Sequence, residues 1–369
     1  MRKALCFGAG NIGRGFIAQV CQESNIKLTF VDVNETLLAL IKEKNEYNIH
    51  LLDESQTSIL IKNVDAIHSQ DIEKLTVAIQ DVDFIFTAVG PNVLKHVGAT
   101  LAKIYGNSPQ LSHSVIACEN MVGGSSKLRE HVLSHDITLP KNVQFLDAAV
   151  DRIVPMSQVE GSLDVKVEPS FEWIVETDKP LGLKDVIEVN DLEPYIKRKL
   201  LMVNGAHAFT AYLGLIYGYE MIDEAISDPM IEKAVRGLIG EHRVFLHHTF
   251  KLDEKDLLKT EDKVVKRFKN KLLQDDCVRV GRTPIRKLAK HERLSMGIDT
   301  LLSLNKEPYF AYQACAAATL YDHDEEGNRL KQMNENELTQ LLLELNFKQN
   351  SIKEIMNNRN SLLSQSVTK

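Results

Sequence analysis

Short apolar runs separated by longer stretches with helical periodicity fill the first half of the chain. The apolar runs occupy residues 4–7, 28–31, 84–89, 114–118 and 143–150. Strands separated by helical lengths predict βαβ units and a parallel sheet. Residues from about 156 to 190 have a β-like pattern, with alternating apolar and polar positions at 163–167 and 172–176. We expect these segments to be extra strands that extend the same sheet.

The pattern changes at Asp191. Glycine and proline become rarer, and long helical patterns run to about residue 357, before a polar tail (361–369) that we expect to fray. A chain of 369 residues is long enough for two domains. We therefore predict an α/β, Rossmann-type doubly wound sheet with extra strands over 1–190, and a mostly α-helical domain over 191–369.

A glycine-rich turn joins the first predicted strand to a predicted helix. Gly8, Gly10 and Gly13 have the spacing of the dinucleotide-binding fingerprint. In that fingerprint the glycines allow a tight turn, let the backbone approach a pyrophosphate, and let the helix pack closely on the strand. Asp32 ends the next predicted strand, where an acidic side chain holds the ribose hydroxyls and repels a 2′-phosphate. The pattern predicts a site for NAD rather than NADP, and a glycine turn without a ligand is the alternative.

Polar residues and glycines also follow directly after other predicted strands. Gly90 and Asn92 follow 84–89, Asn120 follows 114–118, and Asp151 follows 143–150. Ligands of open parallel sheets bind beyond the carboxyl ends of the strands, so these positions are candidate site residues. The residues predicted to bind the cofactor are Gly8, Ala9, Gly10, Asn11, Ile12, Gly13, Arg14, Asp32, Gly90 and Asn92.

Composition narrows the class of protein. The net charge of −7 argues against nucleic acid as a partner, and no apolar run has the length of a membrane span. The first residues lack the apolar stretch of a signal peptide. Five cysteines are scattered without paired spacing, which is typical of reduced thiols in the cytoplasm. We therefore expect a cytoplasmic protein without nucleic-acid or membrane partners.

The segment 199–209 carries the most informative polar residues of the second half. Lys199, Asn204 and His207 lie within an arc of about 140° on a helix, and the residues between them are apolar or small. A helix that is apolar nearly all round is buried, so its polar groups are costly unless they line a polar cavity. A buried lysine has a lowered pKa, and its neutral amine takes a proton from an alcohol. The alternatives are a solvated lysine and a satisfied core histidine.

These motifs together resemble those of the polyol-specific long-chain dehydrogenases. The resemblance rests on residues 7–16, on Asn120 within 118–121, on Asp-Arg-Ile-Val-Pro at 151–155, and on Lys-x4-Asn-x2-His from Lys199. The motifs occur in the family's order over nearly the full length. The resemblance implies a metal-free enzyme that uses NAD to interconvert mannitol 1-phosphate and fructose 6-phosphate.

The same resemblance implies a role for each matched residue. Lys199 is the general acid and base, Asn120 and Asn204 stabilise the oxyanion, and His207 holds the substrate. Asp151 lines the site. An ion pair at a domain interface is the alternative for Asp151 and its neighbour Arg152.

A basic cluster follows further along the chain. Six cations lie within fifteen residues, namely Arg279, Arg282, Arg286, Lys287, Lys290 and Arg293. A guanidinium group can donate two parallel hydrogen bonds to the oxygens of one phosphate. The Gly-x-x-Pro sequence at 281–284 predicts a loop that enters a helix, and the start of a helix is a suitable anion site. The family resemblance implies that Arg279 and Lys287 contact the polyol. The predicted substrate-binding residues are Asp151, Arg279, Arg282, Arg286 and Lys287. A solvated basic face, or contacts with Asp275 and Asp276, is the alternative.

Other functions remain as alternatives. His242, His247 and His248 lack the spacing and third ligand of zinc enzymes, so we expect no metal. A dehydrogenase of free mannitol or of a sugar acid such as fructuronate is one alternative, and an NAD-sensing regulator without turnover is another. The basic cluster favours a phosphorylated polyol or ketose, and Lys199 favours an enzyme. We expect a monomer or a small homo-oligomer.

Overall fold

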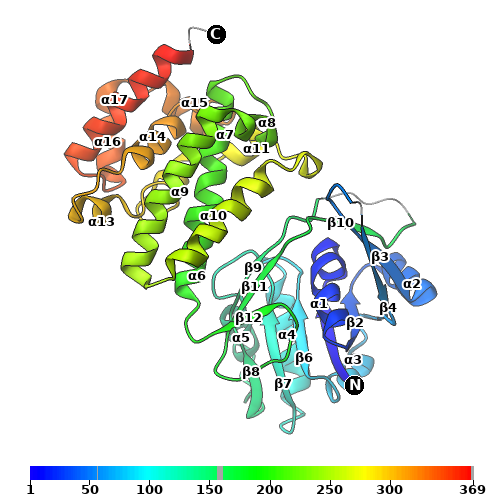
Figure 1. Cartoon of the computed structure of the whole chain (residues 1–369). Coiled ribbons are helices and arrows are strands. Elements are labelled where there is room, and N and C mark those ends of the chain that lie inside the picture. Colours follow the sequence, from blue (N-terminus) through cyan, green and yellow to red (C-terminus); the bar gives the residue numbers. More distant parts are fainter. Residues whose placement is uncertain (56, 156–160, 367–369) are drawn as a thin grey trace. The chain divides into compact units, whose positions relative to one another are not determined.

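The computed structural model describes residues 1–55, 57–155 and 161–366 (Figure 1). The chain divides into two compact units, Met1–Leu192 and Glu193–Lys369. Among the described residues, no helix is long and apolar enough to cross a membrane. All five cysteines are buried free thiols.

The first unit contains both strands and helices. Its strands are β1 (Arg2–Phe7), β2 (Ile26–Asp32), β3 (Glu46–Leu51), β4 (Ser58–Lys62), β5 (Asp65–His68), β6 (Phe84–Thr87), β7 (Ser112–Ala117), β8 (Asn142–Phe145), β9 (Ala148–Asp151), β10 (Val165–Val167), β11 (Glu172–Glu176) and β12 (Val186–Val189). Its helices are α1 (Ala18–Glu23), α2 (Glu35–Lys44), α3 (Ile72–Ile79), α4 (Leu94–Tyr105) and α5 (Gly124–Leu133), and a π-helical turn, Gly13–Ile17, precedes α1.

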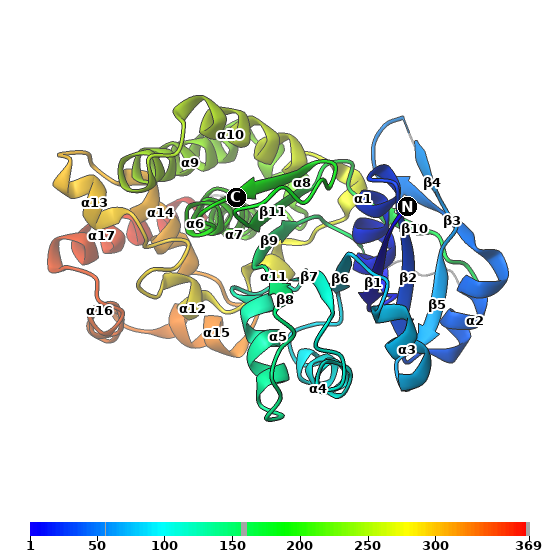
Figure 2. The same cartoon turned by 90° about the horizontal axis from the view of Figure 1, so that it is seen from below.

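A six-stranded parallel sheet in the order β5-β2-β1-β6-β7-β8 forms the centre of this unit. Both of its faces are covered, because Ala4 and Cys6 of β1 pack into one apolar cluster and Leu5 and Phe7 into another. Figure 2 shows α4 and α5 side by side, where α5 packs against β7. The order reverses between β1 and β6, which is the switch point where such sheets bind ligands. The predicted Rossmann-type sheet is confirmed.

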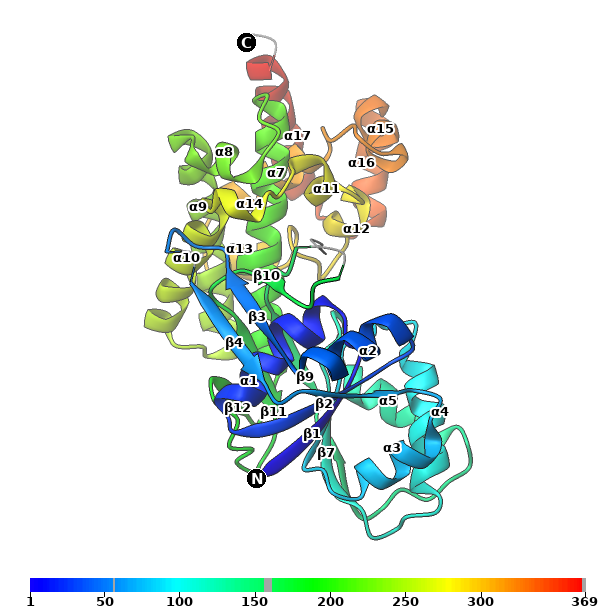
Figure 3. The ribbon, with the colours of Figure 1, turned by 90° about the vertical axis from the view of Figure 1, so that its right-hand side faces the viewer.

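The extra strands exist, but the expectation that they extend this sheet is wrong. β10 pairs with β3 in a three-stranded sheet with β4 (Figure 3), and β11 pairs with β9 and β12 in another. Val165 and Val167 are buried while Lys166 between them is exposed. Such a strand buries one face only, whereas β6 is buried along its whole length. Residues 156–160, where the β-like stretch was expected to begin, lie outside the described residues.

The single strand predicted over 143–150 is divided in two. β8 ends the parallel sheet at Phe145, and β9 begins at Ala148 in a different sheet. Asp147 lies between the two strands, and its carboxylate accepts hydrogen bonds from the Ser126 amide (2.9 Å) and hydroxyl (2.5 Å), which fix the chain at this point. The indole of Trp173 on β11 packs against Phe16 and Phe86, and so joins the second small sheet to the core of the parallel sheet.

The second unit is helical, as the sequence predicts. Its helices are α6 (Glu193–Arg198), α7 (Ala206–Ile216), α8 (Ile222–Ser227), α9 (Pro229–Phe250), α10 (Glu254–Phe268), α11 (Cys277–Gly281), α12 (Pro284–Leu288), α13 (Ile298–Ser303), α14 (Tyr309–Ala318), α15 (Glu325–Gln332), α16 (Glu335–Glu344) and α17 (Gln349–Ser366), with a π-helical turn at Lys199–Gly205 and a 3₁₀ turn at Lys271–Leu273. The expected fraying from residue 361 is wrong as far as 366, because α17 continues there and Leu362 is buried in the core.

Candidate active site

The glycine turn after β1 has the geometry that its sequence predicts. Gly8 has a φ of +101°, and a Cβ atom there would lie 2.4 Å from the Ala88 carbonyl oxygen. A Cβ atom on Gly13 would lie 2.1 Å from the Gly8 carbonyl oxygen, so the helix could not approach the strand. Gly10 faces open space, which fits a close approach of a ligand. Binding of a pyrophosphate by Ala9, Gly10, Asn11 and Ile12 stays a prediction.

Asp32 ends β2 beside this turn. Its Oδ2 atom accepts a hydrogen bond from the Ala9 amide (2.7 Å), and its Oδ1 atom accepts from the amides of Val33 (2.7 Å) and Asn34 (3.0 Å). The carboxylate therefore fixes the glycine turn to the end of the neighbouring strand. It is also at the position where the sequence predicts recognition of a ribose.

Arg14 lies inside the protein rather than on the ligand side of the turn. Its guanidinium donates to the carbonyl oxygens of Ala9 (2.8 Å) and Leu163 (2.6 Å), and the side chain is 1% exposed. Burial lowers the pKa of Arg14 below its ordinary value. Because the guanidinium donates its hydrogen bonds to groups of the protein, Arg14 would contribute to cofactor binding by holding the glycine turn in place.

The carboxyl ends of β6 and β7 lie on the same edge as the glycine turn. Ala88 donates its amide to the Phe7 carbonyl, and Cys118 donates its amide to Thr87. Glu119, which is buried, accepts hydrogen bonds from the Thr87 hydroxyl (2.9 Å) and from the amides of Val89 (3.0 Å) and Gly90 (2.7 Å). The loop after β6 is therefore held by a carboxylate that sequence reasoning did not place in the site. The Gly90 amide, predicted to bind the cofactor, thus donates its hydrogen bond to Glu119.

Asn92 and Asn120 are exposed just beyond these strand ends. Asp151 is half-buried at the end of β9. Its neighbour Arg152 is buried and donates to the Gly15 carbonyl (2.8 Å) and to the Gln19 side chain (2.7 Å), and burial lowers its pKa to about 10. Arg152 therefore binds groups of its own unit.

The helical segment that carries Lys199 differs from the predicted α-helix. Lys199–Gly205 is π-helical, between α6 and α7. The i→i+5 hydrogen bonds of a π-helix bring residues five apart to the same side, whereas such residues lie about 140° apart in an α-helix. The π-helical turn therefore brings Lys199 and Asn204 to one face. Both are half-buried, so the full burial expected for Lys199 is wrong.

Gly205 and His242 support this turn from behind. His242 of α9 is buried, which lowers its pKa to about 3 against the opposing effect of the Leu201 carbonyl. A Cβ atom on Gly205 would lie 3.2 Å from the His242 Cε1 atom and 2.7 Å from the Arg293 carbonyl oxygen. The turn thus packs against a neutral imidazole and a backbone carbonyl with no room for a side chain.

Gly205→Ala is expected to lower both stability and turnover. The new methyl group must displace the turn from Arg293, and such overpacking typically costs about 1–3 kcal/mol of unfolding free energy. Urea unfolding and kcat should be measured beside Gly240→Ala on α9, because Gly240 faces open space. We expect that control to be slightly stabilised, by about 0.5–1 kcal/mol. Unchanged stability and kcat in Gly205→Ala would show that the turn needs no glycine.

His207 belongs to a charged group in the second unit. Its Nε2 atom lies 2.8 Å from the Asp275 Oδ2 atom, and its ring stacks on Phe268 with centroids 4.8 Å apart. Arg279 pairs with the other oxygen of Asp275. Burial would raise the pKa of Asp275, but His207 and Arg279 outweigh burial and lower it.

Asp275 is a residue that sequence reasoning missed as a partner of His207. The structure brings together His207, Asp275 and Arg279, and thereby supports the alternative that Arg279 contacts an aspartate. The Arg279 side chain remains 57% exposed, so this contact does not remove it from solvent. Substrate binding by Arg279 stays a prediction.

Lys287 is deeply buried in the second unit, and its side chain is engaged. Its ammonium group donates to the carbonyl oxygens of Val280 (2.7 Å) and Arg282, and lies 5.6 Å from the centre of the Tyr212 ring. Burial, together with Arg293 and Arg286, lowers its pKa to about 7. Lys287 therefore fixes the loop between α11 and α12.

The expected anion site at the start of α12 is wrong. The amide of Thr283 donates to Asp324 (2.9 Å), and the amide of Ile285 donates to Glu326 (2.6 Å). Protein carboxylates therefore occupy the place that we assigned to a phosphate. Arg282 and Arg286 are exposed on either side of this helix start and stay predicted substrate ligands.

Among the described residues, no group of three or more His, Cys, Asp or Glu side chains could hold a metal ion. His247 and His248 are exposed near the end of α9, whereas His242 is buried behind the π-helical turn.

Both units match models of known protein domains. Residues 2–188 match the mannitol dehydrogenase Rossmann domain, and residues 191–366 match the mannitol dehydrogenase C-terminal domain. Two curated relatives are mannitol-1-phosphate 5-dehydrogenases. The one from Brevibacillus brevis is 41% identical over 88% of this chain and 87% of the relative, and the one from Bacillus pumilus is 40% identical over 90% and 91%.

Solved structures with the same fold are more distant in sequence. A D-sorbitol dehydrogenase in substrate-free form superposes with a TM-score of 0.86 at 16% identity, over 99% of this chain and 93% of that one. A Pseudomonas fluorescens mannitol 2-dehydrogenase, solved as a ternary complex with NAD and D-mannitol, gives 0.67 at 18% identity, over 100% and 93%. At 16% and 18% identity, these two structures show that the fold is shared and nothing further.

Proposed function

The chain belongs to the mannitol dehydrogenase family, and from this membership we propose that it interconverts mannitol 1-phosphate and fructose 6-phosphate with NAD. The reaction makes it an NAD-dependent oxidoreductase of mannitol metabolism. The structural support for the proposal is the π-helical turn Lys199–Gly205, because residues five apart in such a turn, as Lys199 and Asn204 are, share one side. Five free cysteines favour a reducing compartment such as the cytoplasm.

The first unit has the features that NAD requires. The open space at Gly10 leaves room for a pyrophosphate, and the carboxylate of Asp32 ends β2, where a ribose is bound in Rossmann-type folds. Bound NAD supplies the hydride acceptor, or as NADH the hydride donor. Glu119 and Arg14 would keep the loops on either side of it in place.

The second unit supplies the proton chemistry. We assign to Lys199 the removal of the hydroxyl proton during oxidation and its return during reduction. The Asn204 amide donates to the oxygen that becomes an oxyanion, a role shared with Asn120. His207, oriented by Asp275 and Phe268, holds a substrate hydroxyl.

A comparison of fructose 6-phosphate with fructose tests the proposal. NADH consumption, followed by absorbance, should be much faster with the phosphorylated ketose, because Arg282 and Arg286 are exposed and are predicted to bind the phosphate. Equal rates with both sugars would remove the phosphate from the proposal and favour a free-polyol dehydrogenase. Absence of turnover with any ketose, despite NADH binding, would favour an NAD sensor.

Asp32→Ala is expected to reduce the preference for NADH over NADPH by about tenfold or more. Like charges about 4 Å apart repel by about 1 kcal/mol in water and about 4 kcal/mol near a protein surface, and the substitution removes that repulsion. The ratio of kcat/KM for the two cofactors is the measurement. Asp65→Ala at the start of β5 serves as the control. A ratio unchanged in Asp32→Ala would show that this carboxylate does not read the ribose.

A further inference from the structure

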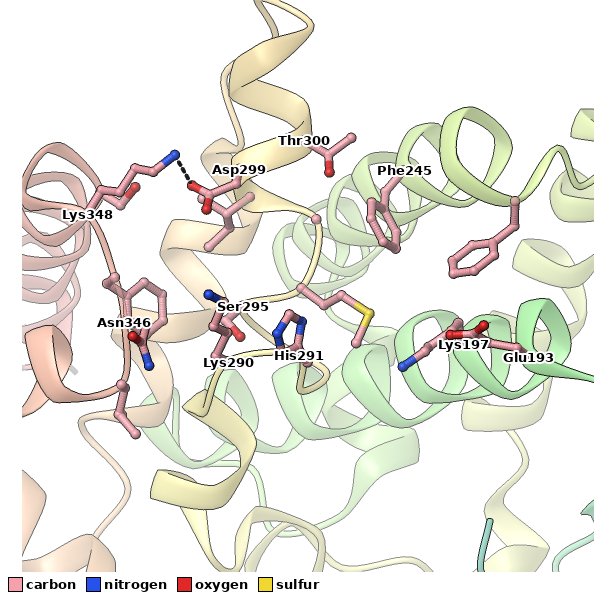
Figure 4. A pocket seen from close by; sticks show the side chains of 17 residues that line it. Glu193, Lys197, Phe245, Lys290, His291, Ser295, Asp299, Thr300, Asn346 and Lys348 are labelled. Carbon is pink, nitrogen blue, oxygen red and sulfur yellow. Dashed lines mark ion pairs between the residues drawn. The ribbon is translucent and has the colours of Figure 1, made fainter. Parts of the chain in front are cut away.

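A cavity of about 330 Å³ lies within the second unit, and Lys290 of the basic cluster is among the residues that line it (Figure 4). Its walls come from α6, the end of α9, the segment 290–300, the turn between α16 and α17, and the start of α17. The volume is within the range of small-molecule sites.

The cavity is on a different face from the proposed catalytic residues. Glu193 and Lys197 line it from α6, and residues four apart share one face of an α-helix. Lys199 follows Lys197 by two residues, which is a rotation of about 200° on a helix. Neither Asn204 nor His207 is among the described residues that line the cavity.

Apolar side chains form one part of the cavity wall. Phe245, Met296 and Phe347 line it and are each more than nine-tenths buried. Phe250 adds an aromatic ring that meets Phe245 edge to face, with centroids 6.0 Å apart. Aromatic rings and a thioether both favour contact with another aromatic ring.

Basic side chains also line the cavity. Lys197, Lys290 and His291 line the cavity, and in the described part of the chain no ion pair within 4.0 Å joins them to a carboxylate. The Asp299 carboxylate, also in the lining, is already paired with Lys348 (2.8 Å). Figure 4 shows Lys197 extending from its helix toward His291 on the opposite wall. The cavity therefore combines apolar side chains with the amino groups of Lys197 and Lys290, which form no ion pair with a carboxylate of the described residues, and Glu193 adds one carboxylate to the lining.

We propose that this cavity binds a small aromatic carboxylate. The aromatic ring of the ligand packs against Phe245 and Met296, and its carboxylate accepts hydrogen bonds from Lys197 and His291. Charge-assisted hydrogen bonds of this kind are stronger than neutral ones, so the anion is bound more tightly than its amide. The ligand contacts the helical segment that continues into the π-helical turn.

Methyl NMR of the full-length protein tests the proposal with 1-naphthoate as the probe. The chain has nine methionines, so ¹³C-methyl labelling gives few signals, and Met296→Leu identifies the signal of the cavity. We expect this signal to shift and saturate on titration. The uncharged 1-naphthamide should bind at least tenfold more weakly. Lys197→Gln should weaken 1-naphthoate by about tenfold, whereas Lys353→Gln, on α17 outside the cavity, should not.

Three results would overturn the proposal. One is the absence of a saturable shift at Met296. Another is equal affinity for 1-naphthoate and 1-naphthamide, which would indicate an apolar cavity without anion recognition. The third is equal weakening in Lys197→Gln and Lys353→Gln, which would indicate general electrostatic attraction. The remaining methionine signals show whether a variant is folded. If Lys197→Gln is unfolded, His291→Gln replaces it, and we expect the same weakening of 1-naphthoate binding.

Discussion

Lys199→Ala is expected to lower kcat by about 10²–10⁴-fold while NADH still binds. The loss follows from removal of the group that we assign to proton transfer, and general acid–base catalysis contributes on that scale. Steady-state kinetics in both directions give kcat, and NADH fluorescence gives the dissociation constant. Lys233→Ala, exposed on α9, is the matched control.

Chemical rescue distinguishes a catalytic role of Lys199 from a structural one. Added methylamine should restore part of the lost activity, because a small amine replaces the missing base without repairing a packing defect. The restored rate should increase with the concentration of free methylamine. Loss of NADH binding, or lost activity that no amine restores, would contradict the assignment of Lys199 as the base.

Asn204→Ala is expected to lower kcat by about 10²–10³-fold with a smaller change in KM. Removal of one donor to an oxyanion typically has this effect, because the hydrogen bond strengthens as negative charge develops. Asn204→Asp should be at least as damaging, since it replaces the donor with a negative charge of similar shape. Asn336→Ala, exposed on α16, should leave kcat unchanged.

The double variant Asn120→Ala/Asn204→Ala tests whether the two amides serve one oxygen atom. Residues that act on the same group are strongly non-additive, so the double variant should lose much less activity than the product of the single losses. Fully multiplicative losses would mean that Asn120 and Asn204 act independently.

The parallel sheet and its glycine turn could be predicted because their signals are local. Gly8, Gly13 and Asp32 act within one βαβ unit, so spacing alone predicts their geometry. The two small sheets depend on distant pairs instead. β3 joins β10 more than a hundred residues later, and nothing in residues 163–167 indicates that partner. The division at Asp147 likewise depends on Ser126 of another element.

In the candidate site, residue types were predictable but their surroundings were not. An α-helical period assigned to 199–209 misses the π-helical turn, which forms where Gly205 packs against His242 and Arg293. The start of α12 has the sequence of an anion site, yet Asp324 and Glu326, each 41 residues from the amides they accept from, already bind there. Only the tertiary structure shows that this place is taken.

The π-helical turn makes the length of its segment a constraint of its own. Deletion of one residue between Lys199 and His207 would restore a regular helix and rotate the two side chains by about 100° relative to each other. Apolar residues such as Leu201 and Met202 can be exchanged for others of similar volume without that rotation. This stretch should therefore accept changes of residue type far more readily than the gain or loss of a single position.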